Sequence, residues 1–455
     1  MPGLAPALPW IASALFSGCL YAVIWYVTRD LDGRARLLAR ATPLAVIVPG
    51  LLSISLVLSA QREDADSGPA ALPRGLGKAS APVRVTGPAE TAVGANTDAT
   101  AQAPGVPPAG RGEWHIVPVF YGTDRMRQGG PQGLRRVAYG SERARRLELG
   151  RALVTVPAAH RVPSIERPFA VRVPYVQLVL YEQGEDPGRH FTIKELQVLP
   201  QERFLTLVRE RLGLSRAFKD QAVVFVHGFN TAFDHALYRT AQIAYDLRFD
   251  GAAFLYSWPS GGGVIGYAHD RESATQAEPY LKEFLTLVVA ETGAKSVSVI
   301  AHSLGNLPLL GVLRELGPAL PAGVRLNEVI LAAPDVDRDV FSNLVAGLTR
   351  YGRGITLYCS ANDRAMSVSR QFAGGVPRAG DVPADGPVIV PGIDTIDVTG
   401  TSTDLLALNH STYAERGALL NDIGLLLQTG ERPPENRVPI LQKVRTARGE
   451  FWRYP

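Results

Sequence analysis

The serine best placed to act as a nucleophile lies in a short turn between a predicted strand and a predicted helix. Ser303 belongs to Ala301–Gly305 (Ala-His-Ser-Leu-Gly), directly after the β-branched run Ser296–Ile300. A serine at such a corner projects its Oγ above the sheet, and the next backbone N–H points to the same place. Ala301 replaces the first glycine of the usual Gly-x-Ser-x-Gly pattern and adds one methyl group. The segment predicts a nucleophile elbow, although the pattern alone also fits a polar strand end that caps a helix.

A second motif supplies groups that stabilise a developing negative charge. The buried strand Ala222–Val226 ends in His227–Asn230 (His-Gly-Phe-Asn). Hydrolases with a nucleophile elbow take one oxyanion-hole N–H from the residue after the nucleophile and one from this loop. We therefore expect the backbone N–H groups of Leu304 and Phe229 to form the oxyanion hole. His227 is interpreted as a histidine that holds the loop by hydrogen bonds.

The expected order of the remaining catalytic groups is an acid followed by a histidine. His410 is the only histidine beyond the elbow, and it lies between the last predicted strand and the final helix. Asp363 follows the predicted strand Ile355–Ser360, where a short loop carries the carboxylate that orients the imidazole. The sequence therefore predicts a triad of Ser303, Asp363 and His410.

A neighbouring acidic pair is the alternative source of the carboxylate. Asp335 and Asp337 follow the preceding strand, Val329–Ala333. Asp337 also fits the N-cap of a following helix, and each of these aspartates fits an Asx turn. Asp363 is the first choice for the triad acid, and Asp335 is the second.

The segment after the predicted strand Ala253–Ser257 supplies aromatic side chains near the expected site. We expect Trp258 and Tyr267 to line a pocket for the acyl or alcohol part of a substrate. The glycines at 261–263 are not followed by the Gly-Lys-Ser/Thr of a phosphate-binding loop. Without a His-Glu-x-x-His pattern or a cysteine pair, we expect no metal and no other cofactor. A net charge of +4 over 455 residues, without a basic block among aromatics, argues against nucleic acid as a partner.

The elements that position these residues alternate between strands and amphipathic helices from Trp114 onwards. This alternation predicts one α/β domain over residues 113–430, with a mostly parallel sheet flanked by helices and an antiparallel edge among the early strands. Gly122–Arg125 is interpreted as a structural turn, and residues 431–455 as a C-terminal tail. The expected strands are His115–Tyr121, Ala152–Pro157, Val176–Tyr181, Ala222–Val226, Ala253–Ser257, Ser296–Ile300, Val329–Ala333, Ile355–Ser360 and Ile393–Val398. The expected helices lie near Gln201–Leu212, Ala232–Leu247, Glu272–Glu291 and Thr412–Leu427.

Two apolar runs precede this domain. Pro9–Val27 and Pro43–Ala60 are each about long enough to cross a bilayer, which predicts two transmembrane helices within residues 1–60. A signal peptide is the competing interpretation of the first run, although it lacks a basic leading segment. Four arginines between the runs place that loop in the cytoplasm, so we expect a multi-pass protein of the bacterial inner membrane with a periplasmic hydrolase domain. Residues 61–112 are rich in Ala, Pro, Gly and Thr and predict a flexible linker.

The motifs together resemble a bacterial family of α/β-hydrolases of unknown function. The resemblance covers Trp114 to Leu427, begins with the lead-in Val119–Arg125, and excludes the membrane runs, the linker and the end of the chain. It implies the α/β-hydrolase fold and hydrolase activity, and it leaves the substrate open. The acidic pair that contains Asp335 is also typical of the family. The motifs that carry the resemblance are His227–Asn230, Ser257–Ser260, Ala301–Gly305, Ala333–Asp337 and Asn409–His410.

These observations predict a membrane-anchored serine hydrolase of the esterase or lipase type. Its substrate would be a carboxylic ester, a thioester or a lipid-like molecule, cleaved through an acyl-enzyme on Ser303. The alternative is a non-catalytic α/β-hydrolase scaffold that binds a cell-envelope component or a partner protein. The residues identify no protein partner.

Overall fold

A computed structural model describes residues 113–128, 138–168, 170–173, 178–182, 184–261, 266–319, 326–348, 352–362, 375–401 and 413–455. The two predicted transmembrane helices and the linker lie outside these residues, as do Asp363 and His410. Within the described ranges, no helix is long and apolar enough to span a bilayer.

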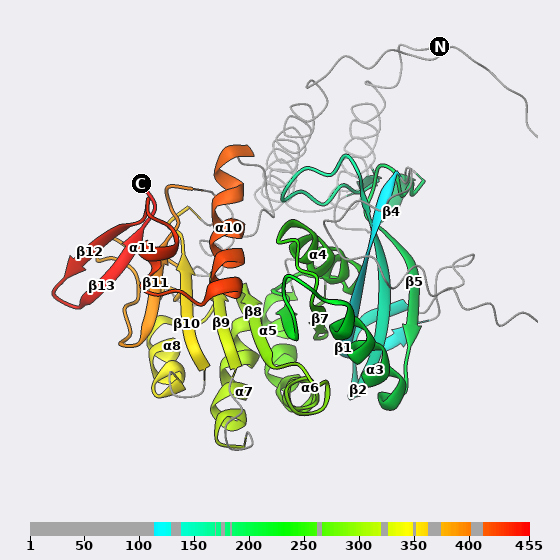
Figure 1. The fold of residues 1–455 in the computed structure, drawn as a ribbon, viewed down its shortest axis with the longest axis horizontal. Coiled ribbons are helices and arrows are strands. Elements are labelled where there is room, and N and C mark those ends of the chain that lie inside the picture. The colour runs from blue at the N-terminus through cyan, green and yellow to red at the C-terminus, as the bar shows by residue number, and fades with distance from the viewer. Residues whose placement is uncertain are drawn as a thin grey trace, which may run out of the picture. The chain divides into compact units, whose positions relative to one another are not determined.

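The described residues form an 11-stranded mixed sheet in the order β12-β13-β11-β10-β9-β8-β6-β7-β1-β2-β5 (Figure 1). Neighbours from β1 through β7, β6, β8, β9 and β10 to β11 are parallel, whereas β2 and β5 extend one edge in antiparallel fashion. The prediction of a mostly parallel sheet with an antiparallel edge is therefore confirmed. The predicted strand near Val176–Tyr181 instead pairs in a separate two-stranded sheet, β3–β4.

The strands are β1 Trp114–Gln128, β2 Ala138–Pro157, β3 Ala170–Val173, β4 Leu178–Glu182, β5 Thr192–Val198, β6 Gln221–Val226, β7 Ala252–Ser257, β8 Ser296–His302, β9 Leu326–Ala332, β10 Gly352–Cys359, β11 Ile393–Asp397, β12 Gln442–Thr446 and β13 Gly449–Arg453. The helices are α3 Gln201–Leu214, α4 Phe233–Asp246, α5 Tyr267–Gln276, α6 Glu278–Glu291, α7 Asn306–Ala319, α8 Arg338–Val345, α10 Tyr413–Thr429 and α11 Pro434–Arg437, with a 3-10 turn η3 at Ser303–Gly305.

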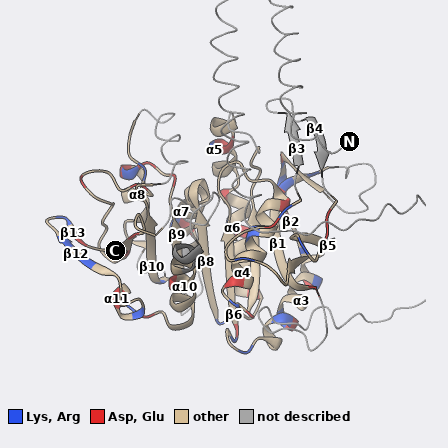
Figure 2. Ribbon diagram, turned by 90° about the horizontal axis from the view of Figure 1, so that it is seen from above, with Lys and Arg blue, Asp and Glu red and all other residues tan. Residues whose placement is uncertain are grey.

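Helices cover both faces of the sheet. One core lies between the sheet and α3, α5, α6, α7 and α8, and the other lies under α4 and α10 (Figure 1). Alternate residues of a strand point to opposite faces, so Val224 enters the first core while Val223 and Phe225 enter the second. Strands β6, β7 and β8 contain no Lys, Arg, Asp or Glu, and the ribbon of β8 is accordingly tan (Figure 2). Burial on both faces explains why these strands appear in the sequence as continuous apolar runs.

Two local predictions were wrong. Gly122–Arg125 is not a turn but lies within β1, between β7 and β2, and Thr123 and Arg125 are buried there. The helix predicted over Glu272–Glu291 is two helices, α5 and α6, that meet at Ala277. Pro279 lies in the first turn of the second helix, the place where a proline is tolerated, because it lacks an N–H and clashes with the preceding turn.

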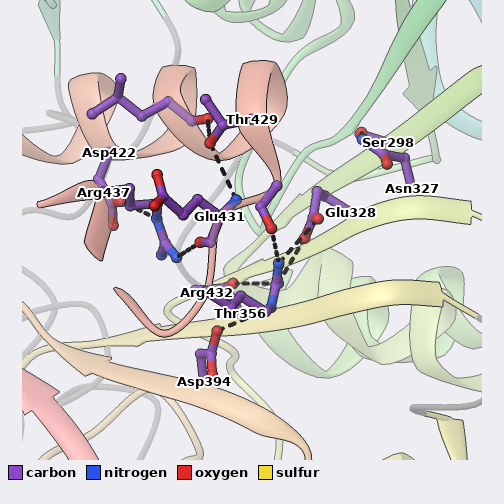
Figure 3. A network of polar contacts seen from close by, with 12 residues as sticks. Ser298, Asn327, Glu328, Thr356, Asp394, Asp422, Thr429, Glu431, Arg432 and Arg437 are labelled. Atoms are coloured by element: carbon purple, nitrogen blue, oxygen red, sulfur yellow. Dashed lines mark hydrogen bonds and ion pairs between the residues drawn. The ribbon is translucent and has the colours of Figure 1, made fainter. Parts of the chain in front are cut away.

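The end of the chain is part of the domain, which corrects its interpretation as a tail. Strand β13 runs parallel to β11, and β12 pairs antiparallel with β13. The guanidinium of Arg432 lies over Gly354, where a side chain would collide with it, and makes ion pairs with Glu328 and Asp394 (Figure 3). Arg437 adds a buried ion pair with Asp422 at 2.6 Å (Figure 3). These contacts join residues 430–455 to the sheet and to α10.

Candidate active site

Ser303 occupies a strained turn between β8 and α7. Its backbone φ angle is +51°, in the left-handed region that residues with a Cβ rarely adopt. Asn306 holds this turn, because its side-chain Nδ2 donates to the carbonyl oxygen of Ser303 at 2.8 Å. The expected strand-to-helix corner is therefore present, with the serine 8% exposed.

Two glycines allow the backbone to close around the serine. A Cβ at Gly228 would lie 2.8 Å from the Cβ of Ser303, and a Cβ at Gly305 would lie 2.3 Å from the carbonyl oxygen of His227. Ala301 is fully buried in the core, which accommodates its methyl group. The turn at Ser303 and the loop after β6, His227–Thr231, are thus in direct contact. We call this segment the β6 loop.

Aromatic stacking supports the β6 loop. The Trp258 ring stacks on the imidazole of His227 with centroids 4.9 Å apart, and its Nε1–H donates to the His227 carbonyl at 2.8 Å. His227 Nδ1 lies 2.8 Å from the carbonyl oxygen of Gly228. Burial, together with the positive charge of Arg125, lowers the pKa of His227 to about 3. The side chain is therefore neutral and makes the loop-holding contacts inferred from the sequence.

Arg125 lies at the centre of this support. It is 1% exposed, and all five of its N–H donors have acceptors. Nε donates to Ser257 Oγ at 2.9 Å, and Nη1 donates to the carbonyls of Gly140 and Ser260 at 3.0 and 3.1 Å. Nη2 donates to the Thr231 carbonyl at 2.6 Å and approaches His227 Nε2 to 3.3 Å. One side chain from β1 therefore joins β2, the β6 loop and the loop after β7.

Asp270 makes a second connection between the same loops. Its carboxylate is fully buried and accepts from the Ser260 hydroxyl at 2.5 Å and from the Gly261 N–H at 2.6 Å. It also accepts from the N–H of Asn230 at 3.2 Å. Asn230 has φ +54°, so the carboxylate helps to hold a left-handed residue of the β6 loop in place.

The two predicted pocket residues occupy different environments. Trp258 has no exposed surface, and its observed contacts support His227 rather than forming an open wall. Tyr267 begins α5 and is partly exposed, with its ring edge-on to Phe229 at 5.4 Å. Both side chains therefore lie beside the β6 loop, but only Tyr267 has exposed surface there.

Asp335 lies next to the turn as well, in a buried polar cluster. Its backbone N–H donates to the Ser303 carbonyl at 3.2 Å. Its carboxylate forms an ion pair with Arg378 Nε at 3.2 Å and accepts from the Tyr267 hydroxyl at 3.0 Å. Both members of the ion pair are buried. Asp337 instead caps α8, as its alternative interpretation suggested, by accepting from the backbone N–H groups of Asp339 and Val340.

The strands that precede the other two triad candidates in the sequence, β10 and β11, end at the same edge of the sheet as β8. Asp363 follows β10, and His410 lies between β11 and α10. These strands are parallel to β8 in the order β8-β9-β10-β11, so their carboxyl ends meet on one side. The two residues themselves lie outside the described part of the chain.

Several residues around the turn were not identified as site residues from the sequence. Arg125, Asp270, Asn306 and Arg378 are all nine-tenths buried or more, and each bonds to a loop at the carboxyl edge. A signal existed only for Arg125, which ends the lead-in segment of the family resemblance. Asp270 and Arg378 bond to residues far away in the sequence, Asn230 and Asp335, and Asn306 bonds to a nearby backbone carbonyl, so none of the three leaves a local residue pattern.

Comparison with known proteins supports the fold. Residues 207–428, which include Ser303, match a family model described as "Alpha/beta hydrolase of unknown function (DUF900)". An uncharacterized protein of Nostoc sp. (strain PCC 7120), alr1448, is 32% identical over 75 residues. That alignment covers 16% of this chain and 20% of the relative, so the chain spans about a fifth of that protein's length. The family match, which covers just under half of the chain, and the sheet topology together support the α/β-hydrolase fold for this domain.

Proposed function

We propose that this protein is a membrane-anchored serine hydrolase that cleaves a carboxylic ester, a thioester or a lipid-like substrate. The observation that carries the proposal is the left-handed turn at Ser303, held against the β6 loop by Gly228 and Gly305. A non-glycine residue in this conformation is costly, and such strain is concentrated at functional sites. The alternative of a polar strand end that caps a helix does not require that strain.

In the proposed reaction, Ser303 Oγ attacks the substrate carbonyl while His410 accepts the hydroxyl proton. Asp363 fixes the tautomer of His410, and the N–H groups of Phe229 and Leu304 bind the oxyanion. Collapse of the tetrahedral intermediate releases the alcohol or thiol, which takes the proton from His410. Water then hydrolyses the acyl-enzyme, and His410 acts first as base and again as acid.

Two features of the described site support these assignments. His227 and His302 belong to the two segments that meet at Ser303, and burial lowers the pKa of each to about 3. A general base works best with a pKa near the working pH, which favours His410 over both. Arg378 and Tyr267 already engage the two carboxylate oxygens of Asp335, which favours Asp363 as the acid.

The membrane anchor is the part of the proposal that rests on the sequence. The runs Pro9–Val27 and Pro43–Ala60 would form two transmembrane helices, and the arginines between them would place the hydrolase domain in the periplasm of a bacterium. Alkaline phosphatase fused after Ala60 tests this topology. We expect an active fusion, and an inactive but stable fusion would reverse the orientation.

Labelling with a fluorophosphonate tests the catalytic proposal directly. We expect one covalent adduct on Ser303 of the full-length protein in detergent, together with hydrolysis of short p-nitrophenyl esters. The Ser303→Ala variant should lose both, and Ser298→Ala, a buried serine earlier in β8, should keep both. Absence of an adduct on the folded protein, or unchanged hydrolysis by Ser303→Ala, would reject the proposal and favour a binding scaffold.

A further inference from the structure

The hydrogen bonds of Arg125 determine the protonation of His227. Guanidinium nitrogens carry only donors, so the contact from Nη2 to His227 Nε2 at 3.3 Å requires Nε2 to accept. The Ser257 hydroxyl lies 3.2 Å from the same nitrogen and is able to donate to it. The proton of a neutral imidazole is then on Nδ1, which faces the Gly228 carbonyl at 2.8 Å. The opposite tautomer would place a lone pair against that carbonyl oxygen, so only the Nδ1–H form fits both contacts.

The Gly228 carbonyl and the Phe229 N–H belong to the same peptide unit. Because a trans peptide is planar, its C=O and N–H point in opposite directions. A bond from His227 Nδ1–H that holds the carbonyl on one side therefore directs the Phe229 N–H to the other side. A Cβ at Gly228 would lie 2.8 Å from the Cβ of Ser303, so this peptide is adjacent to the serine.

We propose that Arg125 and His227 are positioning residues that act in series on the oxyanion hole. This inference rests on the proposed function, in which the Phe229 N–H is an oxyanion donor. Arg125 fixes the tautomer of His227, and His227 aims the peptide by binding the Gly228 carbonyl. A hydrogen bond to the carbonyl also polarises the peptide and strengthens its N–H as a donor, as in other hydrogen-bonded chains.

The charge of Arg125 adds to this effect. The acceptors of its hydrogen bonds are backbone carbonyls, a hydroxyl and an imidazole, all of them neutral. Burying a guanidinium without a carboxylate on its donors costs free energy. The positive charge of Arg125, next to the peptide between Gly228 and Phe229, becomes more favourable when negative charge develops on the substrate oxygen. The arrangement therefore stabilises the transition state more than the ground state.

Kinetics on a matched pair of substrates separate positioning from a general structural role. Full-length wild type and variants hydrolyse a p-nitrophenyl ester and the corresponding thiono ester, in which sulfur replaces the carbonyl oxygen. Sulfur is a weak hydrogen-bond acceptor, so the thiono ester gains less from the oxyanion hole. Arg125→Met and His227→Phe remove the two links. We expect kcat on the oxygen ester to fall about 10²-fold with little change in KM, and the oxygen-to-sulfur ratio of kcat/KM to fall with it.

Two further variants sharpen the comparison. His227→Asn keeps an N–H donor at the place of Nδ1 and should recover part of the lost rate, which His227→Phe does not. Arg211→Met removes another buried arginine, which donates to the carbonyl of Gly251 just before β7 begins, at the end of that strand away from the β6 loop. It should leave the oxygen-to-sulfur ratio at the wild-type value. If Arg125→Met does not fold, the comparison of His227→Asn with His227→Phe still decides the question.

Each outcome has one meaning. A falling ratio in the folded variants, with recovery by His227→Asn, supports the inference. An unchanged ratio in folded Arg125→Met and His227→Phe overturns it and leaves the serine hydrolase proposal intact. A wild-type protein that hydrolyses neither ester and forms no fluorophosphonate adduct rejects both.

Discussion

The Asp335 carboxylate and the Arg378 guanidinium form a buried ion pair beside the turn that carries Ser303. The Asp335 backbone N–H donates to the Ser303 carbonyl, and the Tyr267 hydroxyl closes the cluster over the carboxylate. A buried charge that loses its partner is strongly destabilising, whereas the intact pair is close to neutral in free energy. The pair therefore fixes the Asp335 carboxylate beside the Ser303 turn, and Asp363 stays our first choice for the triad acid.

Neutralising each of the two aspartates separates these roles. Asp363→Asn should lower kcat about 10⁴-fold with little change in stability, because an amide favours the wrong tautomer of the catalytic histidine. Asp335→Asn should lower the free energy of unfolding by about 3 kcal/mol, because Arg378 remains buried without its partner. Its kcat per folded molecule should stay within about tenfold of wild type. Steady-state kinetics with active-site titration and urea unfolding measure the two effects. A large loss of kcat in Asp335→Asn, with little change in Asp363→Asn, would make Asp335 the triad acid.

A histidine held by two carboxylates predicts a loss of stability at alkaline pH. Burial alone would lower the pKa of His160, but hydrogen bonds to Asp246 at 2.9 Å and Glu166 at 2.8 Å outweigh it and raise the pKa to about 9. Because the folded pKa exceeds the unfolded value of 6.5, the stabilisation is fully present below pH 6.5 and is lost as the pH rises through 9. His160→Gln should cost about 2 kcal/mol at pH 6 and much less at pH 9.5. Urea unfolding at both values checks this, and an equal cost at the two would contradict it.

A buried acid predicts a pH dependence over a lower range. Burial raises the pKa of Asp124 to about 7, and its Oδ1 lies 3.0 Å from a Tyr256 hydroxyl that also contacts the Ala277 carbonyl at 3.1 Å. One hydroxyl proton cannot serve both acceptors, so a protonated Asp124 completes the bonding. The folded pKa is again the higher one, so this contribution is present below pH 3.8 and is lost as the pH rises through 7.

Asp124→Asn should therefore stabilise the protein at pH 8 by about 1–3 kcal/mol and have little effect at pH 4. The amide is neutral at both values and keeps a donor for Tyr256. Thermal unfolding at the two pH values provides the measurement. A destabilised variant at pH 8 would mean that the carboxylate is charged and paired in the native state.

The parts of the fold that the sequence predicts well are those in which local composition alone determines the structure. Strands such as β6 and β8 are buried on both faces and therefore consist mainly of apolar residues and contain no Lys, Arg, Asp or Glu. The turn at Ser303 is recognised from its own short motif, because the close approach of its backbone to the β6 loop leaves no room for a side chain at residue 305. Each of these features is marked by residues within one short segment.

The parts that the sequence did not predict depend on distant partners. Arg125 interrupts an apolar strand, and its acceptors, which run from residue 140 to residue 260, converge on it only in the fold. Strand β13 is short and half polar, and β11 gives it a place in the sheet. The sequence suggested that Trp258 lines a pocket, because it lies next to a glycine-rich loop. In the structure its ring instead stacks on the imidazole of His227.

Glycine substitutions test the tight approach of the two backbones. A Cβ at Gly305 would lie 2.3 Å from the His227 carbonyl oxygen, and backbone cannot move aside as a flexible side chain does. Gly305→Ala should therefore lower the free energy of unfolding by about 1–3 kcal/mol. It should also slow fluorophosphonate labelling of Ser303, because the β6 loop is pushed away from the serine. Gly213 lies in α3 with no atom near its would-be Cβ, so Gly213→Ala should stabilise by up to about 1 kcal/mol and label at the wild-type rate. Equal behaviour of the two variants in urea unfolding and labelling would show that the contact between the β6 loop and the turn does not constrain the site.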